Sequence, residues 1–313
     1  MKVTDFNLVK QELREEKSLQ GISSVPSLAL IKKTLIFDLC TIRRIIMSVF
    51  LMVLVPVIAL GFISDQLSGD EHILEFLGFV TWYYNFAIIF PIIIIGATGP
   101  LISEELRTGT LLFLISKPIN RTTIALAKFI ALYIFGMIVS LLSLIIISLF
   151  TVIIHFQSIG IGEYIGIFFI YSLVITLFYG GITMSFSSIF RKPRNVTFLP
   201  LALVIFSFLV IMMFKPYIIF SDKNWYEDYL LYNFDIGYHF ANVFLWIGES
   251  IVPEIEDYFI AFVIFGIFKI EPGGDIGDKT NYYHPVGSFI YLIVVAIIFL
   301  VLGVLYLKKR DIS

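Results

Sequence analysis

Charged residues are scarce in this chain of 313 residues: they make up 15% of it, whereas an average soluble domain contains about 25%. Hydrophobic residues account for 58%, and the mean hydropathy is +0.94. A globular protein of this length would still need a polar surface around its core, which this composition cannot supply. The same composition excludes a disordered chain, a collagen-like repeat, a coiled coil and a disulfide scaffold.

Cysteine occurs once, at Cys40, so the chain cannot form an internal disulfide. A phosphate-binding loop is missing too, because no glycine directly precedes a lysine. We therefore expect that this chain cannot hydrolyse ATP alone. Acidic residues and histidine are absent from the interiors of the long apolar segments. This absence disfavours an ion-coupled transporter, although backbone carbonyl groups can also bind ions.

Six apolar segments are long enough to cross a bilayer, which takes about 20 mostly apolar residues in a helix. They are Ile45–Ile63, Phe76–Ala97, Phe129–Ile154, Tyr164–Phe190, Thr197–Phe214 and Phe289–Leu307. The sequence therefore predicts an all-α polytopic membrane protein with six transmembrane helices. The fourth segment is crowded with small and hydroxyl residues, which either pack helices closely or line a polar path. These are Ser172, Thr176, Gly180, Gly181, Thr183, Ser185, Ser187 and Ser188.

The basic residues predict the orientation of the six helices. They cluster before the first span, in the second and fourth connections and after the last span, whereas the connections 64–75 and 155–163 contain neither Lys nor Arg. Because Lys and Arg concentrate in cytoplasmic loops, we expect both termini to be cytoplasmic. In this topology 18 of the 22 basic residues lie inside and 16 of the 24 acidic residues lie outside. The charge is thus strongly polarised across the membrane.

The chain divides into five predicted parts. Residues 1–26 form a cytoplasmic N-terminal segment, residues 27–44 an amphipathic interfacial helix, and residues 45–214 the first five spans. Residues 215–288 form a helical, acidic extracytoplasmic cap, and residues 289–313 form the sixth span with a cytoplasmic tail. The apolar face of the interfacial helix consists of Leu28, Ile31, Leu35, Leu39 and Ile42, which recur at three- and four-residue steps.

The predicted cap contains one further apolar segment, Tyr258–Ile270. It is too short for an ordinary span, and counting it as a seventh would place the basic cluster at 308–310 outside. We therefore expect an outer-surface helix there. The cap could attract cationic ligands through its 11 acidic residues, or it could be a folded extension with only a packing role.

Metal and catalytic sites are not indicated by the sequence. All four histidines fall on the predicted outer side and lack a ligand spacing such as H-x-x-x-H: His72, His155, His239 and His284. We expect packing roles for them rather than a zinc or copper site. No arrangement of serine, histidine and acid, or of paired carboxylates, lies in a membrane-embedded setting. The chain is thus predicted to bind no metal or cofactor and not to be an enzyme.

The connection between the second and third spans is the most informative segment. Ser103 is a plausible helix N-cap, and Glu104 and Glu105 would favour a helix N-terminus. Leu106, Thr110, Leu111 and Leu114 mark one side of a short helix, which Pro118 ends. Asn120 can then start the next helix. We therefore expect a structured helical elbow at residues 98–123, either packed on the bundle or offering its apolar side to a soluble partner.

The elbow resembles the permease subunits of type-2 ABC exporters. The resemblance rests on Glu105-x-x-x-Gly109-Thr110-Leu111, then Leu114-Ile-Ser116-x-Pro118-x-x-Arg121, then Lys128. It extends to the six-span plan, the surface helix before the first span and the Lys-Lys-Arg-Asp ending. The long connection 215–288 is a departure, because smaller members have a short pair of outer helices there.

The resemblance implies how such a chain would work. An elbow formed or braced by six residues would dock on a separate ATP-binding subunit, which would carry ATP and Mg: Glu104, Glu105, Gly109, Thr110, Pro118 and Arg121. The chain would then act in the cell membrane as the permease of an ATP-driven exporter. A second permease chain, identical or different, would complete it within the lipid bilayer, and no nucleic acid would be involved.

An alternative function remains open at this stage. The large acidic cap would also suit an ATP-independent secondary transporter, a channel or a membrane-anchored assembly factor. The elbow residues would then merely cap two helices. The sequence does not identify a substrate under either hypothesis.

Overall fold

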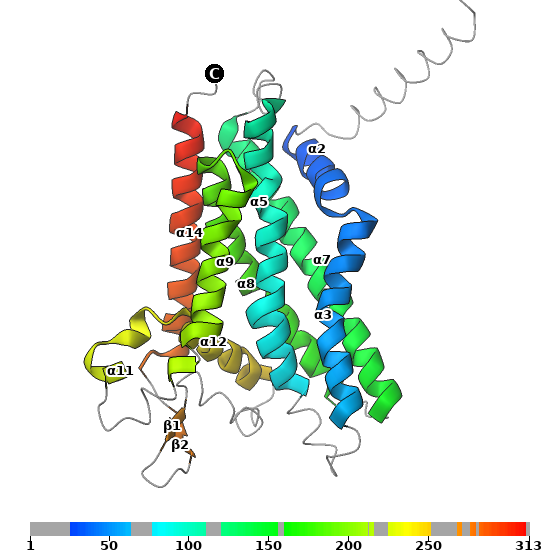
Figure 1. Ribbon diagram of the computed structural model, residues 1–313, viewed down its shortest axis with the longest axis vertical. Coiled ribbons are helices and arrows are strands. Elements are labelled where there is room, and N and C mark those ends of the chain that lie inside the picture. The colour runs from blue at the N-terminus through cyan, green and yellow to red at the C-terminus, as the bar shows by residue number, and fades with distance from the viewer. Residues whose placement is uncertain are drawn as a thin grey trace, which may run out of the picture.

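The computed structural model describes residues 26–63, 77–110, 120–155, 160–211, 213–215, 225–251, 268–270, 276–279 and 282–310. Within these residues the chain is almost wholly helical, and six helices are long and apolar enough to cross a membrane. They lie side by side as an elongated bundle (Figure 1). The six predicted spans are therefore confirmed in number and order.

The spans are built from regular and π-helical elements. The six are α3 (Ile42–Ile63), η2 (Thr81–Ile89) with α5 (Phe90–Thr108), α7 (Arg121–His155), α8 (Ile161–Ile189), α9 (Pro193–Ile205) with η3 (Phe206–Val210), and α14 (Pro285–Lys309). The end of the bundle at which α5, α8 and α14 end and α7 and α9 begin is called the elbow end below. The opposite end, at which α7 ends and α8 and α14 begin, is called the cap end.

Helix α8 lies at the centre of the bundle and packs against α14, α5 and α7. All eight small and hydroxyl residues noted in this span are buried. Two close approaches require glycine there: a Cβ atom at Gly181 would lie 3.0 Å from the carbonyl oxygen of Ala296, and one at Gly303 would lie 2.5 Å from the Cα of Ser185. These residues therefore pack the helices closely, as small residues do in membranes.

The segment that precedes the first span is not one regular helix. It consists of α2 (Pro26–Lys33) and the π-helical η1 (Thr34–Leu39), and both pack on α7. The π-helical turn shifts the helical phase, so Leu39 is fully buried whereas Leu28 and Ile42 are 56% and 77% exposed. The predicted helix over residues 27–44 is therefore interrupted, and Leu28, Leu39 and Ile42 do not share one environment.

Helix α12 (Ile236–Ile251) lies across the cap end of the bundle (Figure 1). Its Phe244 ring lies 5.0 Å from the ring of Phe168 and 5.1 Å from that of Tyr171, and its Phe240 ring lies 5.2 Å from Phe178. All five aromatic side chains are at most 2% exposed. Helix α12 is thus packed into the membrane-spanning core rather than resting on it.

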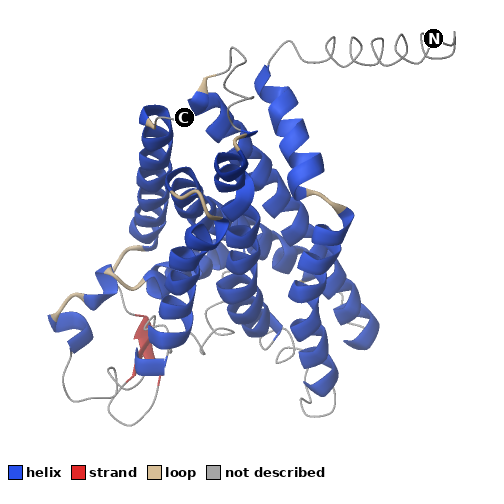
Figure 2. Cartoon of the chain, turned by 45° about the horizontal axis from the view of Figure 1, so that its top comes forward, coloured by secondary structure: helices blue, strands red, loops and turns tan. Residues whose placement is uncertain are grey.

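Two short strands, β1 (Phe268–Ile270) and β2 (Ile276–Lys279), pair antiparallel at the cap end (Figures 1 and 2). The helix predicted over Tyr258–Ile270 is therefore wrong for its last three residues, and residues 258–267 lie outside the described residues. The sequence between the strands contains Pro272, Gly273 and Gly274, which favour a turn over a continuing helix. Short helices α11 (Trp225–Asp228) and η4 (Leu231–Asn233) complete the described part of residues 215–288.

A buried polar cluster joins α12 to the end of the fifth span. Lys215 and Asp235 form an ion pair with side chains only 2% and 4% exposed. Asp235 also accepts hydrogen bonds from the Tyr226 hydroxyl at 2.8 Å and from the Tyr238 amide at 3.0 Å. The second of these caps the N-terminus of α12. One carboxylate therefore fixes both the start of α12 and the position of the Lys215 ammonium group.

His239 makes the stability of this region depend on pH. It is fully buried, its Nδ1 lies 3.0 Å from the Ser288 hydroxyl, and its ring stacks on Tyr291. Burial lowers the pKa of His239 from 6.5 to about 4. Because the unfolded chain then binds more protons than the folded one between these values, stability rises with pH in this window and is lost as the pH falls from 6.5 to 4.

We expect the lowered pKa of His239 to reduce the free energy of unfolding by about 3 kcal/mol between neutral pH and pH 4. Thermal unfolding in detergent, repeated at several pH values between 7.5 and 4, measures the slope of stability against pH. His239→Gln, which can still hydrogen-bond to Ser288, should flatten that slope relative to the natural chain. Equal slopes in the two proteins would show that His239 does not titrate differently on unfolding.

Candidate functional site

Helix α5 continues through the predicted start of the elbow and ends at Thr108. Gly109 follows in the left-handed region, with φ of +75°, which glycine adopts without strain at a helix C-terminus. The expectation that Ser103 is a helix N-cap is therefore wrong: Ser103 lies inside α5, and its hydroxyl donates to the carbonyl of Gly99 at 2.6 Å. Pro118 and the rest of residues 111–119 lie outside the described residues.

One hydroxyl of α8 hydrogen-bonds to the backbone of α5 beside Pro100. Proline has no amide hydrogen and so removes one backbone hydrogen bond from the helix. The Ser187 Oγ atom of α8 accepts from the amides of Ile102 and Ser103, both at 3.1 Å, and donates to the Gly99 carbonyl at 2.9 Å. Ser187 thus supplies polar contacts where the helix is locally weakened.

Gly99 also sets the distance between α5 and α9, because a Cβ atom there would lie 2.6 Å from the Thr197 Cγ2 atom. We expect Gly99→Ala to destabilise the protein by about 1–3 kcal/mol through overpacking. Gly96→Ala is the control on the same helix, since a Cβ atom at Gly96 meets nothing within 4 Å. Adding Thr197→Ser to Gly99→Ala removes the clashing methyl group and should restore stability. A Gly99→Ala protein as stable as Gly96→Ala in thermal unfolding would contradict this reasoning.

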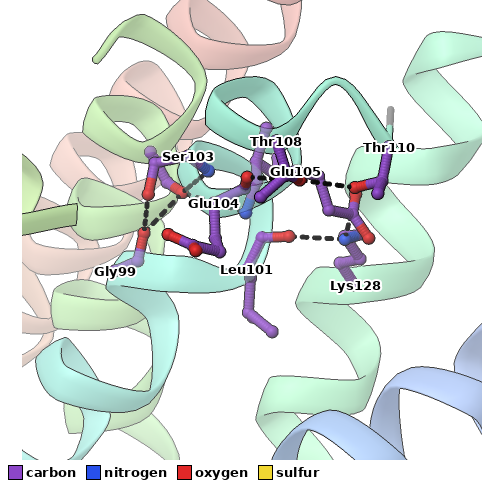
Figure 3. Close-up of polar contacts among 10 residues, drawn as sticks. Gly99, Leu101, Ser103, Glu104, Glu105, Thr108, Thr110 and Lys128 are labelled. Atoms are coloured by element: carbon purple, nitrogen blue, oxygen red, sulfur yellow. Dashed lines mark hydrogen bonds and ion pairs between the residues drawn. The ribbon is translucent and has the colours of Figure 1, made fainter. Parts of the chain in front are cut away.

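A buried ion pair connects the end of α5 to α7. The Lys128 ammonium group lies 2.6 Å from a carboxylate oxygen of Glu105 and also donates to the carbonyl of Leu101 (Figure 3). The Lys128 side chain is 1% exposed, whereas that of Glu105 is 18% exposed. Glu105 therefore braces the joint between α5 and α7 from the inside. In the sequence, Lys128 is a single basic residue in an otherwise apolar stretch of α7, which indicates that it needs a partner. The sequence does not show that the partners are Glu105 and Leu101.

The remaining polar residues at the end of α5 face outward. Glu104 and Arg107 pair with each other, at 39% and 57% exposure. Thr108 donates to the Glu104 carbonyl at 2.9 Å, and its hydroxyl lies 2.9 Å from that of Thr110. We call these four residues the elbow surface. A surface ion pair of this kind contributes little to stability, so the surface is free to serve contacts with another protein.

Arg121 begins α7 and caps the end of α14. Its guanidinium group donates to the carbonyls of Arg310 at 2.6 Å and of Leu307 at 3.2 Å. Arg310 in turn donates to the carbonyls of Ser188 and Ile189 at the end of α8, both at 2.9 Å. Terminal carbonyls of a helix lack partners within the helix and carry partial negative charge, so each arginine is well placed.

The five predicted elbow residues that the structure describes therefore separate in space. Glu105 is internal, Glu104 and Thr110 are on the elbow surface, Gly109 ends α5, and Arg121 contacts α14 instead. The interactions of Lys128 and Arg310 were missed, although both belong to segments that were singled out in the sequence. Together the contacts connect α5 to α7, α7 to α14 and α14 to α8 at one end of the bundle.

The described residues of the elbow end form no metal centre. Among the described residues there is no group of three or more His, Cys, Asp or Glu side chains that could hold a metal ion. What this end offers is mechanical: an exposed polar surface directly beside a buried joint between rigid helices. A displacement of the end of α5 would be passed to three other spans.

Comparison with known protein families gives a match. The model of one family, described as ABC-2 family transporter protein, matches residues 10–312. The match covers nearly the entire chain, including both the elbow and the cap-end segment. No curated protein matches the chain significantly.

Proposed function

Because the chain belongs to the ABC-2 family of transporter proteins, we propose that it is the permease subunit of an exporter driven by a separate ATP-hydrolysing subunit. ATP and Mg²⁺ bind to that partner, whereas this chain holds no cofactor and is not itself an enzyme. The observation that carries the proposal is the buried Glu105–Lys128 joint directly behind the elbow surface. The cargo, whose identity is open, moves outward across the cell membrane.

Transmission of force requires stiffness between the docking surface and the spans. The Glu105–Lys128 pair passes a movement of α5 to α7, and Arg121 and Arg310 pass it on to α14 and α8. Closely packed helices move as rigid bodies between a few arrangements rather than deforming continuously. Nucleotide-driven movement at the elbow surface would therefore reach four spans together.

The proposal places the elbow end in the cytoplasm, with both termini on that side. Its support is the concentration of basic residues there, Arg107, Arg121 and Arg310 among them, and their scarcity in the predicted outer connections. A second permease chain, identical or different, completes the transporter, because six spans rarely enclose a substrate path. The lipid bilayer surrounds both chains.

Co-purification is the direct test. A tagged chain solubilised gently should bring down a subunit that carries a phosphate-binding loop and hydrolyses ATP. Reversing the charges of the elbow surface with Glu104→Lys and Arg107→Glu should reduce recovery of that subunit at least tenfold. The matched control is Asp228→Lys, an exposed position at the cap end. Absence of any ATPase subunit would contradict the proposal, as would nucleotide-independent transport in proteoliposomes driven by a pH or sodium gradient.

The single native cysteine gives a simple test of orientation. Cys40 can be replaced by serine and a cysteine introduced by Thr108→Cys on the elbow surface, where the side chain is exposed. A membrane-impermeant maleimide should label this position only after the cells are permeabilised. Labelling of intact cells would overturn both the topology and the docking function.

A further inference from the structure

A pocket of about 540 Å³ lies between α7, α8, α12 and α14. Its walls include Tyr133 of α7, Leu173 and Leu177 of α8, Trp246 of α12, and Phe289 and Ile293 of α14. The volume falls within the range of pockets that bind drug-sized ligands. None of the residues of the elbow contributes to it, so it is separate from the site described above.

The chemistry of the lining excludes most classes of ligand. It contains no charged side chain, and its two hydroxyl hydrogens are already used: Tyr133 donates to the carbonyl of Leu173 at 3.3 Å, and Ser250 donates to that of Trp246 at 2.8 Å. The indole N–H of Trp246 adds a single donor. A polar ligand would leave most of its own donors and acceptors without partners, which disfavours its binding. The occupant must therefore be hydrocarbon over most of its length.

The surroundings of the pocket indicate where such a ligand comes from. The wall residue Ile170 is 44% exposed, and Ile290 and Val294 on the neighbouring face of α14 are 54% and 45% exposed. These side chains belong to membrane-spanning helices, so the medium at their surface is lipid hydrocarbon rather than water. Because Ile170 belongs to the wall and is itself partly exposed, the pocket borders that surface.

We propose that the pocket holds one acyl chain of a bilayer lipid, resident between α12 and the bundle. The chain fills the space between Trp246 on one side and Leu173 and Ile293 on the other, and completes the packing of α12 on α8 and α14. Left unfilled, the pocket would deprive the side chains that line it of dispersion contacts. The inference needs only the membrane-spanning fold and is independent of coupling to ATP.

Native mass spectrometry of the purified full chain tests the proposal. The natural protein should retain one phospholipid per chain after washing with detergent that removes bulk lipid. The variant Leu173→Trp/Ile293→Trp narrows the pocket and should lower that retention at least tenfold. The control carries the same substitutions on the lipid-facing side of α14, Ile298→Trp/Leu302→Trp, where the side chains are 51% and 53% exposed. It should retain lipid like the natural protein.

A second measurement keeps the proposal falsifiable if the narrowed variant does not fold. A phosphatidylcholine brominated in the middle of its acyl chain is titrated into the delipidated natural protein in detergent. Fluorescence quenching of Trp246, taken as the difference from Trp246→Phe, should saturate at one lipid per chain. Quenching that rises linearly without saturation would overturn the proposal. So would retention that is equal in the narrowed variant and the control, or retention of a compound that is not a lipid.

Discussion

Glu105→Ala is expected to destabilise the protein more than Lys128→Met, although both changes remove the same ion pair. The asymmetry follows from exposure, since the Lys128 side chain is 1% exposed and that of Glu105 is 18% exposed. Without Glu105 the buried ammonium group loses its adjacent carboxylate and keeps the Leu101 carbonyl as its hydrogen-bond acceptor, which costs about 3–5 kcal/mol. Without Lys128 the carboxylate can turn toward water, so the cost should be nearer 1–2 kcal/mol.

A double-mutant cycle measures this interaction. Glu105→Ala/Lys128→Met removes both charges and should be within about 1 kcal/mol of Lys128→Met, because replacing a buried pair by apolar groups is often nearly neutral. Glu104→Ala is the matched control, one residue away on the elbow surface, and should change the free energy of unfolding by about 0–1 kcal/mol. If Glu105→Ala and Glu104→Ala were equally stable in thermal unfolding, the internal brace would not exist.

The membrane-spanning helices were predictable because each is determined by the hydropathy of its own consecutive residues. About 20 consecutive apolar residues without charge have few alternatives to a spanning helix, so all six spans were found. The length of α5 was not predictable in the same way, because hydropathy shows where the hydrocarbon ends and not where the helix ends. Glu104 and Glu105 suit a first turn, but they are also good helix formers and simply continue α5 to Thr108.

The contacts of the elbow end depend on residues far apart in the sequence. Arg121 meets the end of α14 across 189 positions, and Arg310 reaches the end of α8 across 122. Residue type and charge showed that these arginines lie on one side of the membrane, but only helix packing decides which terminal carbonyls they meet. The resemblance implied that Arg121 and Glu105 form or brace the elbow, but only the structure shows which contacts they make inside the bundle.

Asp235→Asn is expected to be the most damaging single change at the cap end. Asparagine keeps the size of the side chain and can still cap α12 through its oxygen, so the variant removes the charge and the acceptor that Lys215 and Tyr226 share. It takes away the carboxylate that faces the Lys215 ammonium group, whose side chain is 2% exposed, and should cost about 3–5 kcal/mol. Asp228→Asn, at an exposed position in α11, is the same substitution and should cost at most about 0.5 kcal/mol.

Stability in thermal unfolding should be largely regained in Asp235→Asn/Lys215→Met, which removes both charges and keeps the cap of α12. That recovery would show that the loss arises from the buried charge rather than from the helix cap or the Tyr226 hydrogen bond. A double variant no more stable than Asp235→Asn would instead assign the loss to those contacts. Because the pair joins the fifth span to the helix that closes the cap end, its rupture should also raise hydrogen exchange in α12 while leaving the elbow end unchanged.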